Sequence, residues 1–172
     1  SGGAAFVACR ASICLAAIKL AEALGVSDSA SLILVAKTML NVLDMPAPAK
    51  GKGGPSEEEL LMQTARHVST SLRHLLLLAD TESCLLEVIE QGLVPWVSAQ
   101  FGESLRSPQA DSRMSVVLEI LCSACVSAGE GFGSIEAKVK QPLLHLVGNH
   151  PSPLVQLNAT YCMRVVAHSS PG

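Results

Sequence analysis

Two segments of this sequence follow the same pattern 45 residues apart. Ser107-Pro108 and Ser152-Pro153 each place a serine where it can cap a helix and a proline at the first helical position, where no backbone N–H is needed. Steps of three and four residues keep apolar side chains on one helix face. Offsets of 3, 7, 10 and 14 from each serine give Ala110, Met114, Val117 and Leu121, then Val155, Ala159, Cys162 and Val166. The pattern predicts two helices that bury the same face, and hence a fold of repeated helices.

A further helix is expected upstream of each copy, because apolar segments with an internal proline, Pro95 and Pro142, recur 47 residues apart. Helix pairs with a period of about 40 to 47 residues are typical of α-solenoids. Residues 88–128, with a short helix ending at Gly92 and a second entered through Val94-Pro95, resemble an armadillo repeat. Residues 140–167 are similar to the HEAT variant, and the last helix is also similar to a repeat of large HEAT proteins that accompany clathrin adaptors. The resemblance implies an all-α fold, an armadillo/HEAT-like right-handed superhelix of stacked helix pairs.

The chain divides at residues 45–56, whose prolines, glycines and lysines predict a flexible loop. Residues 1–44 before it predict an N-terminal helical hairpin, with Gly25 placed to cap the first helix. Its expected buried faces are Phe6, Cys9, Ile13, Ala17, Leu20 and Leu24, then Leu32, Val35, Met39 and Val42.

Residues 57–172 predict the armadillo/HEAT-like repeats, which are clearest at about residues 80–128 and 134–168. Ser56 and Glu59 fit a capping box at the start of a long helix. Later helices are expected to end at Gly92, Gly102, Gly129 and Gly148. Hairpin and repeats are expected to form one continuous solenoid. The chain begins at Ser1 without Met, which favours a fragment of a longer protein.

Composition argues against several classes of function. Hydrophobic residues make up 49% of the chain and aromatic residues 3%, which suits close-packed helices better than a β-sandwich. A formal charge of −3 without a basic block argues against direct nucleic-acid binding. Arg10, Lys19 and Glu22 interrupt the apolar N-terminal run, so no membrane insertion is expected. Six cysteines in apolar segments without a disulfide pattern predict an intracellular protein and favour the cytoplasm over the nucleus.

No catalytic or metal motif has the spacing that its chemistry requires. Cys122 and Cys125 form a CxxC inside a predicted helix, which favours core packing. His67 and His74 are two helical turns apart, too far to bind one metal. Residues 129–134, GEGFGS, lack the strand and the lysine of a phosphate loop and predict an interhelical turn. We therefore expect no enzyme activity, no metal and no cofactor, although a catalytic site assembled only by the fold would leave no such motif.

The resemblance implies a concave surface, formed by the third or B helices, that binds a partner peptide or helix. The polar side chains expected there are Arg113, Glu119, Gln156 and Arg164. Trp96 is a candidate anchor if it is exposed and a core residue if it is not. Armadillo proteins that bind nuclear-localisation peptides use Trp and Asn one turn apart on their third helices, a pattern that Trp96 and Asn158 do not reproduce.

The predicted function is a non-catalytic scaffold for protein–protein interaction. One alternative is a purely structural segment of a longer armadillo/HEAT protein, for example in vesicle trafficking or another large assembly. Exposed ends of such a segment would self-associate. A further alternative is an enzyme or regulatory subunit whose site is formed by the fold.

Overall fold

The computed structural model describes residues 2–46, 56–106 and 111–169, and all regular structure in these ranges is helical. The expected all-α class is therefore confirmed. The elements are α1 (Gly2–Ala23), α2 (Ser29–Asp44), α3 (Glu57–Leu76), α4 (Glu82–Val88), the π-helical η1 (Ile89–Leu93), α5 (Val94–Arg106), α6 (Asp111–Ala128), the 3-10 helix η2 (Gly129–Phe132), α7 (Gly133–Asn149) and α8 (Pro153–His168). Most of the predicted flexible loop, and the Ser107-Pro108 helix start, lie outside the described residues.

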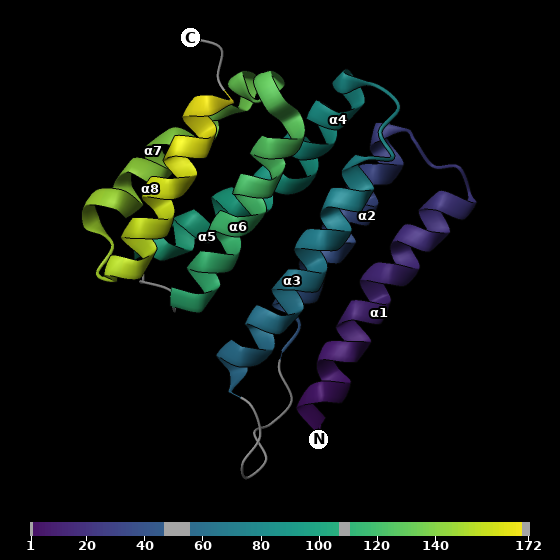
Figure 1. Cartoon of the computed structure of the whole chain (residues 1–172), viewed down its shortest axis with the longest axis horizontal. Helices are drawn as coiled ribbons and strands as arrows, with labels where there is room; N and C mark the ends of the chain where they lie inside the picture. The colour runs from purple at the N-terminus through teal and green to yellow at the C-terminus, as the bar shows by residue number, and fades with distance from the viewer. Residues whose placement is uncertain (1, 47–55, 107–110, 170–172) are drawn as a thin grey trace.

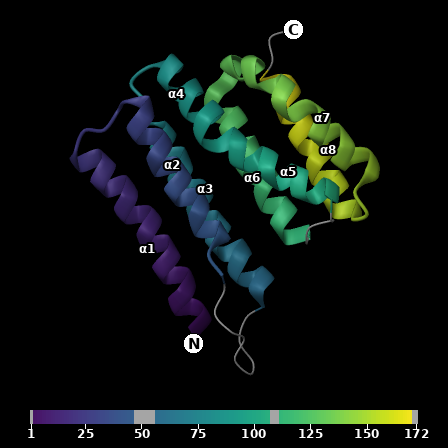
Figure 2. The same cartoon turned by 180° about the vertical axis from the view of Figure 1, so that it is seen from behind.

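The helices form two layers, which the opposite views of Figure 1 and Figure 2 show from either side. In one layer α1, α3, α6 and α8 lie side by side in that order, each in contact with the next. In the other layer α2 contacts α4 and η1, and α5 contacts α7. The layers meet where α2 packs on α3, α5 on α6 and α7 on α8. From α2 onward, with α4, η1 and α5 taken together, successive helices therefore alternate between the layers.

One continuous core extends from Cys14 in α1 to Val166 in α8. Its side chains are mostly aliphatic, with Phe101 and Phe132 as fully buried aromatic residues. The N-terminal hairpin belongs to this core, because α1 and α2 both contact α3, and α2 also contacts α4 and η1. The hairpin therefore packs directly on the helices that follow residue 56.

Two helix ends have the capping chemistry expected from the sequence. The Ser56 hydroxyl accepts a hydrogen bond from the Glu59 N–H at 3.1 Å, and the Glu59 carboxylate accepts one from the Ser56 N–H at 2.7 Å. These reciprocal bonds complete the capping box of α3. Beyond α1, Gly25 has a φ of +63°, and the Val26 N–H donates to the Ala21 carbonyl at 2.9 Å. This is a Schellman cap, in which glycine takes the left-handed conformation.

The repeated apolar face is buried in both copies, as predicted. Its buried members are Met114, Val117, Leu121, Val155, Ala159, Cys162 and Val166. Ala110 lies outside the described residues. Pro153 stands at the start of α8 after Ser152, whose hydroxyl donates to the Asp111 carboxylate at 2.6 Å instead of capping its own helix. Equivalent faces of two adjacent helices therefore meet the same core.

The predicted buried face of α1 is wrong. Cys9, Leu20 and Leu24 are exposed. The face that is buried carries Val7, Arg10, Cys14, Ile18 and Ala21. Apolar residues lie on nearly every side of α1, so their spacing does not single out one face, and packing against α2 and α3 decides it. The buried face includes a charged residue because the Arg10 guanidinium finds partners on α3 and beyond α2.

Two helical stretches, Gly3–Ala23 and Asp111–Phe132, are long and apolar enough to cross a membrane by length and composition. Core helices of soluble proteins meet the same criterion, so the expected absence of membrane insertion stays a prediction. The second stretch is 56% buried, but the first is only 28% buried. On α1 the side chains of Leu15 and Leu20 are 56% and 60% exposed. They lie on either side of the exposed residue Ala16, and these three residues form an apolar outer face of α1.

Gly92, Gly102 and Gly148 do not end helices, which corrects the expectation from the sequence. Helical structure continues from α4 through η1 into α5, and α7 extends past Gly148 to Asn149. At Gly92 the physical reason is close packing. A Cβ there would lie 3.3 Å from the Cβ of Ala36 and 3.8 Å from the Cα of Ile33, both on α2. Glycine therefore allows η1 to approach α2 closely.

Replacing Gly92 should destabilise the protein, whereas replacing Gly148 should not. We expect Gly92→Val to lower the free energy of unfolding by about 1–3 kcal/mol, because the added side chain has no room against α2. A Cβ at Gly148 meets nothing within 4 Å, so Gly148→Ala should raise it by up to about 1 kcal/mol. Urea unfolding followed by circular dichroism measures both. Equal midpoints for Gly92→Val and the wild type would contradict the close-packing role.

Candidate functional site

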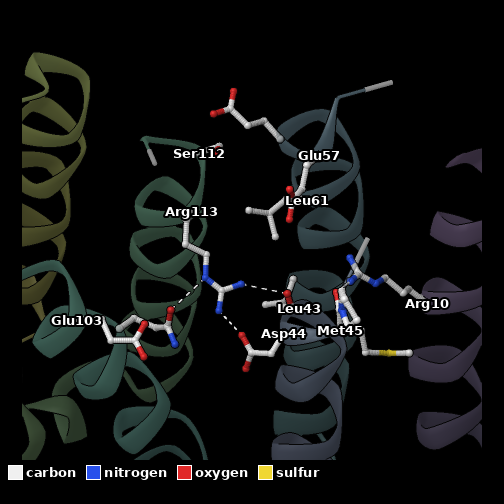
Figure 3. A pocket seen from close by; sticks show the side chains of 12 residues that line it. Arg10, Leu43, Asp44, Met45, Glu57, Leu61, Glu103, Ser112 and Arg113 are labelled. Atoms are coloured by element: carbon white, nitrogen blue, oxygen red, sulfur yellow. Dashed lines mark hydrogen bonds and ion pairs between the residues drawn. The ribbon is translucent and has the colours of Figure 1, made fainter. Parts of the chain in front are cut away.

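A hollow of about 730 Å³ lies where the end of α2 meets the first turns of α3 and α6 (Figure 3). Residues of α1 and α5 complete its lining. The charged side chains in the lining are Arg10, Asp44, Glu57, Glu58, Glu103 and Arg113. Helix ends explain much of this clustering. Glu57 and Glu58 lie in the first turn of α3, where the helix dipole favours anions, and Arg113 lies beside the C-terminus of α2, where it favours cations.

Arg113, near the start of α6, joins this helix to the end of α2 and to the middle of α5. Its Nε donates to the Gln100 Oε1 of α5 at 3.0 Å, and its Nη1 donates to the Leu43 carbonyl of α2 at 3.0 Å. Its Nη2 pairs with the Asp44 carboxylate (Figure 3). The Leu43 carbonyl is one of the last four of α2, which lack partners within their own helix. Arg113, from α6, therefore serves as a C-terminal cap for α2.

Trp96 completes the cluster, which we name the Asp44 junction (Asp44, Trp96 and Arg113). The indole Nε1 donates to Asp44 Oδ2 at 3.0 Å, while Arg113 pairs with Oδ1. The Arg113 guanidinium lies 5.2 Å from the centroid of the Trp96 ring, within the range of a cation–π interaction. Two of the five candidate partner-binding residues are thus neighbours whose polar groups are already bonded within the chain.

Arg10 borders the hollow from the α1 side and is only 3% exposed. Its guanidinium lies 3.9 Å from the centroid of the Phe6 ring. It donates to the Thr64 hydroxyl at 3.4 Å and to the Met45 carbonyl. Among the described residues its Nε has no hydrogen-bond partner. A buried guanidinium with this few partners depends on nearby negative charge.

Negative charge predominates in the hollow. Burial lowers the pKa of Arg10, and the positive charge of Arg113 lowers it further, whereas Asp44 and Glu57 raise it. In the whole lining, four carboxylates accompany two guanidinium groups. The excess of carboxylates suits a basic group of a ligand, such as a Lys or Arg side chain of a partner.

A second hollow, of about 420 Å³, is a groove along α3, α6 and α8. Between Met114 and Val126, the α6 residues that are not buried follow each other at steps of four, three and four. These residues, which we name the α6 strip, are Ser115, Glu119, Cys122 and Val126, and all four line the groove. Flanking residues are Met62 and Arg73 of α3 and Asn158, Tyr161 and Val165 of α8.

Hydrogen bonds fix the walls of the groove to α6. Arg73 Nη2 of α3 donates to the Ser123 hydroxyl at 3.2 Å. On the other side, Asn158 Nδ2 of α8 donates to the Ser115 hydroxyl at 3.1 Å. The groove therefore has oriented polar groups beside apolar ones, the combination found at protein interfaces.

The other three candidate partner-binding residues do not gather at one place. Glu119 lies in the groove. Gln156 turns back toward the start of α8, where its Nε2 donates to the His150 carbonyl at 2.7 Å. Arg164 is exposed on α8.

Sequence reasoning missed Arg10, Asp44 and Tyr161, which help to form the two hollows. Asp44 and Arg10 gain their partners from contacts 35 to 69 residues away in the chain, which no local pattern indicates. Tyr161 did carry a signal, because it is the one tyrosine of the chain and stands in an apolar helix. Tyrosine is enriched at interfaces, where its ring and hydroxyl are both used.

Within the described ranges, no three His, Cys, Asp or Glu side chains come together as a metal site would require. Cys122 and Cys125 both lie within α6, the first partly exposed and the second buried. Comparisons with models of known protein families, with curated proteins and with solved structures find no match to this chain. Its function is therefore argued from its own residues.

Removing the Arg113 side chain should weaken the fold. We expect Arg113→Ala to lower the free energy of unfolding by about 2 kcal/mol, because the variant leaves Asp44 and the Leu43 carbonyl without their charged donor. Arg164→Ala is the matched control, since Arg164 is exposed on α8, and we expect a change below about 0.5 kcal/mol. Urea unfolding measures both variants. If Arg113→Ala unfolded at the same urea concentration as Arg164→Ala, the capping role of Arg113 would be refuted.

Proposed function

We propose that this chain is a non-catalytic interaction module that binds an extended or helical segment of a partner protein in the groove along α3, α6 and α8. The observation that carries the proposal is the α6 strip. α6 is otherwise buried over most of its surface, and the strip is the side that it presents to the groove, between the two flanking helices. Such a surface can hold a partner segment by the helix-in-groove mode.

We further propose that the two layers form an armadillo/HEAT-like superhelix. The alternation of helices between the layers supports this, because α2 with α3, α5 with α6, and α7 with α8 form packed pairs. In such solenoids the helices of one layer line a common binding surface. The proposed groove belongs to the layer of α3, α6 and α8, which contains the predicted third or B helices.

The side chains of the groove are of the types that carry binding energy. Val126 of α6 and Tyr161 of α8 are 71% and 64% exposed and line the groove from neighbouring helices. Arg73 and Glu119 add opposite charges to the same lining. Interface hot spots are enriched in tyrosine and arginine next to apolar contacts. We therefore expect Tyr161 to be the main anchor for a partner.

The acidic hollow at the Asp44 junction extends the proposed surface. Leu61 lines the hollow and the adjacent Met62 lines the groove, so α3 passes from one to the other. A partner segment lying in the groove could therefore place a Lys or Arg side chain near Glu57 and Glu58. This favours partners with a basic residue at one end of an apolar segment.

Peptides selected from a random display library on the wild-type chain test the groove. We expect Tyr161→Ala combined with Glu119→Lys to weaken the selected peptides about tenfold or more, measured by fluorescence anisotropy. Leu34→Ala is the matched control, because Leu34 is 68% exposed but lies on α2 in the other layer. Peptides that bound the double variant as well as the wild type would place the binding site elsewhere.

A second candidate function is a structural segment of a longer repeat protein. The apolar outer face of α1 favours it, with Leu15 and Leu20 well exposed. Lys19 and Glu22 add little charge to that face because they pair with each other at 2.8 Å. In a stack of helices, such a face is normally covered by a neighbouring repeat.

A structural role predicts self-association of the isolated chain through α1. We expect dimers or larger species in sedimentation velocity experiments, and Leu15→Gln combined with Leu20→Gln should shift them to monomer, because these leucines are exposed on the outer face. Leu77→Gln, at a side chain that is 80% exposed beyond the end of α3, should leave the association unchanged. A wild-type chain that remained monomeric at high concentration would count against this second candidate.

A further inference from the structure

Two cysteines meet where α6 packs on α8. Cys122 is partly exposed and lines the groove, whereas Cys162 of α8 is fully buried. The Cys162 sulfur lies 4.0 Å from the Leu118 carbonyl, which is one turn before Cys122 on α6. In α6 the Leu118 carbonyl is the helical partner of the Cys122 N–H, so the Cys162 sulfur lies against the turn of α6 that carries Cys122. Cys122 therefore lines the groove, and Cys162 is buried beside the same turn.

The two thiols have opposite tendencies to ionise. The hydrogen bond with Cys162 lowers the pKa of Cys122, against burial and the negative charge of Glu119, which raise it. The same bond, together with burial, raises the pKa of Cys162. A proton on Cys162 thus stabilises a thiolate on Cys122. A partly exposed thiolate with a second cysteine beside it is the arrangement of redox-sensitive cysteines.

We propose that Cys122 and Cys162 form a redox-responsive pair, in which a hydroperoxide that enters the groove oxidises Cys122 and Cys162 then closes a disulfide between α6 and α8. The inference does not depend on peptide binding in the groove. It assigns a covalent modification to these two helices.

The chemistry balances with one peroxide and two thiols. The Cys122 thiolate attacks one peroxide oxygen, the O–O bond breaks, and Cys122 becomes a sulfenic acid while the leaving hydroxide takes a proton to form water. The Cys162 sulfur then attacks the Cys122 sulfur, the S–S bond forms and the S–O bond breaks. The second hydroxide leaves with the proton of Cys162 as water. Two thiols are oxidised to one disulfide, and one hydrogen peroxide is reduced to two waters.

The other cysteines are less suited to this reaction. Cys125 is buried, which raises its pKa. It follows Cys122 by three residues in one helix, where Cβ atoms are about 5–6 Å apart, farther than the roughly 3.5–4.5 Å of a disulfide. Cys14 and Cys84 are buried, and their thiol pKa values are likewise raised by burial. Cys9 is exposed on α1, away from the groove.

The test uses the fully reduced 172-residue chain and hydrogen peroxide as the oxidant. After treatment, free thiols are blocked with N-ethylmaleimide and the digested protein is analysed by mass spectrometry without reduction. We expect a Cys122–Cys162 linked peptide and the loss of two free thiols per chain. In Cys125→Ser, the matched control on the same helix, the linked peptide should persist. In Cys122→Ser, Cys162 should remain free, because the residue that reacts with peroxide is gone.

Alkylation provides a second readout in the wild type, which avoids any variant that fails to fold. We expect iodoacetamide to modify Cys122 about tenfold or more faster than Cys125 at neutral pH, since one pKa unit changes the thiolate fraction about tenfold. The proposal is overturned if peroxide oxidises Cys9 while Cys122 and Cys162 both remain free, or if Cys122 pairs with Cys125 instead. Mass spectrometry identifies the linked cysteines directly. Either of these results would therefore leave the proposed peptide binding in the groove unaffected, because that proposal has its own binding test.

Discussion

The burial of α6 is the constraint on which the other helices depend. This helix contacts α3 and α8 on either side within its own layer, and α5, α4, η1 and η2 also pack against it. Its buried residues include long aliphatic side chains such as Leu121 together with the small Ala124, Ser123 and Cys125. Small side chains let neighbouring helices approach closely, and interiors packed this densely leave little room for rearrangement. The same apolar character makes the stretch Asp111–Phe132 long and apolar enough to cross a membrane by length and composition. More than half of this stretch is nevertheless buried inside the protein.

Sequence reasoning predicts the fold best where the signal is local and worst where neighbouring helices decide the outcome. The capping box at Ser56 and the left-handed glycine at Gly25 depend on a few adjacent residues, and the structure confirms both. The buried offsets of α6 and α8 are also confirmed, because each face is marked by apolar side chains at regular steps. In α1 apolar residues occur all round the helix, so the buried side is set by α2 and α3. The wrong prediction of a helix end at Gly92 has the same reason. Only the position of α2 shows that glycine is needed there, so that η1 can approach α2 closely.

The candidate site is less accessible to sequence reasoning than the fold. Trp96 and Arg113 are residue types that often bind partners, but here both contact Asp44, which is 52 and 69 residues away in the chain. Residue type alone therefore identifies Trp96 and Arg113 as candidates for binding a partner. It does not indicate that they stabilise the end of α2, because Asp44 is far away in the chain. Glu119 is the case in which the expectation and the groove coincide, because its outward position follows directly from the helical period of α6. Tyr161 becomes its neighbour only when α8 packs beside α6.

The two hollows are mechanically connected because α6 lines both. Arg113 near its start contributes to the acidic hollow and holds α2, while Glu119 and Cys122 in its middle line the groove. At about 1.5 Å per residue, Arg113 and Cys122 are separated by roughly 14 Å along one rigid helix. A partner bound in both hollows would therefore contact α6 at two points and resist its displacement from α2 and α8. A covalent bond between Cys122 and Cys162 would act on the same contact from within, because it would join the α6 strip to the wall of the groove that carries Tyr161. Binding and oxidation would then both depend on how α6 and α8 pack against each other.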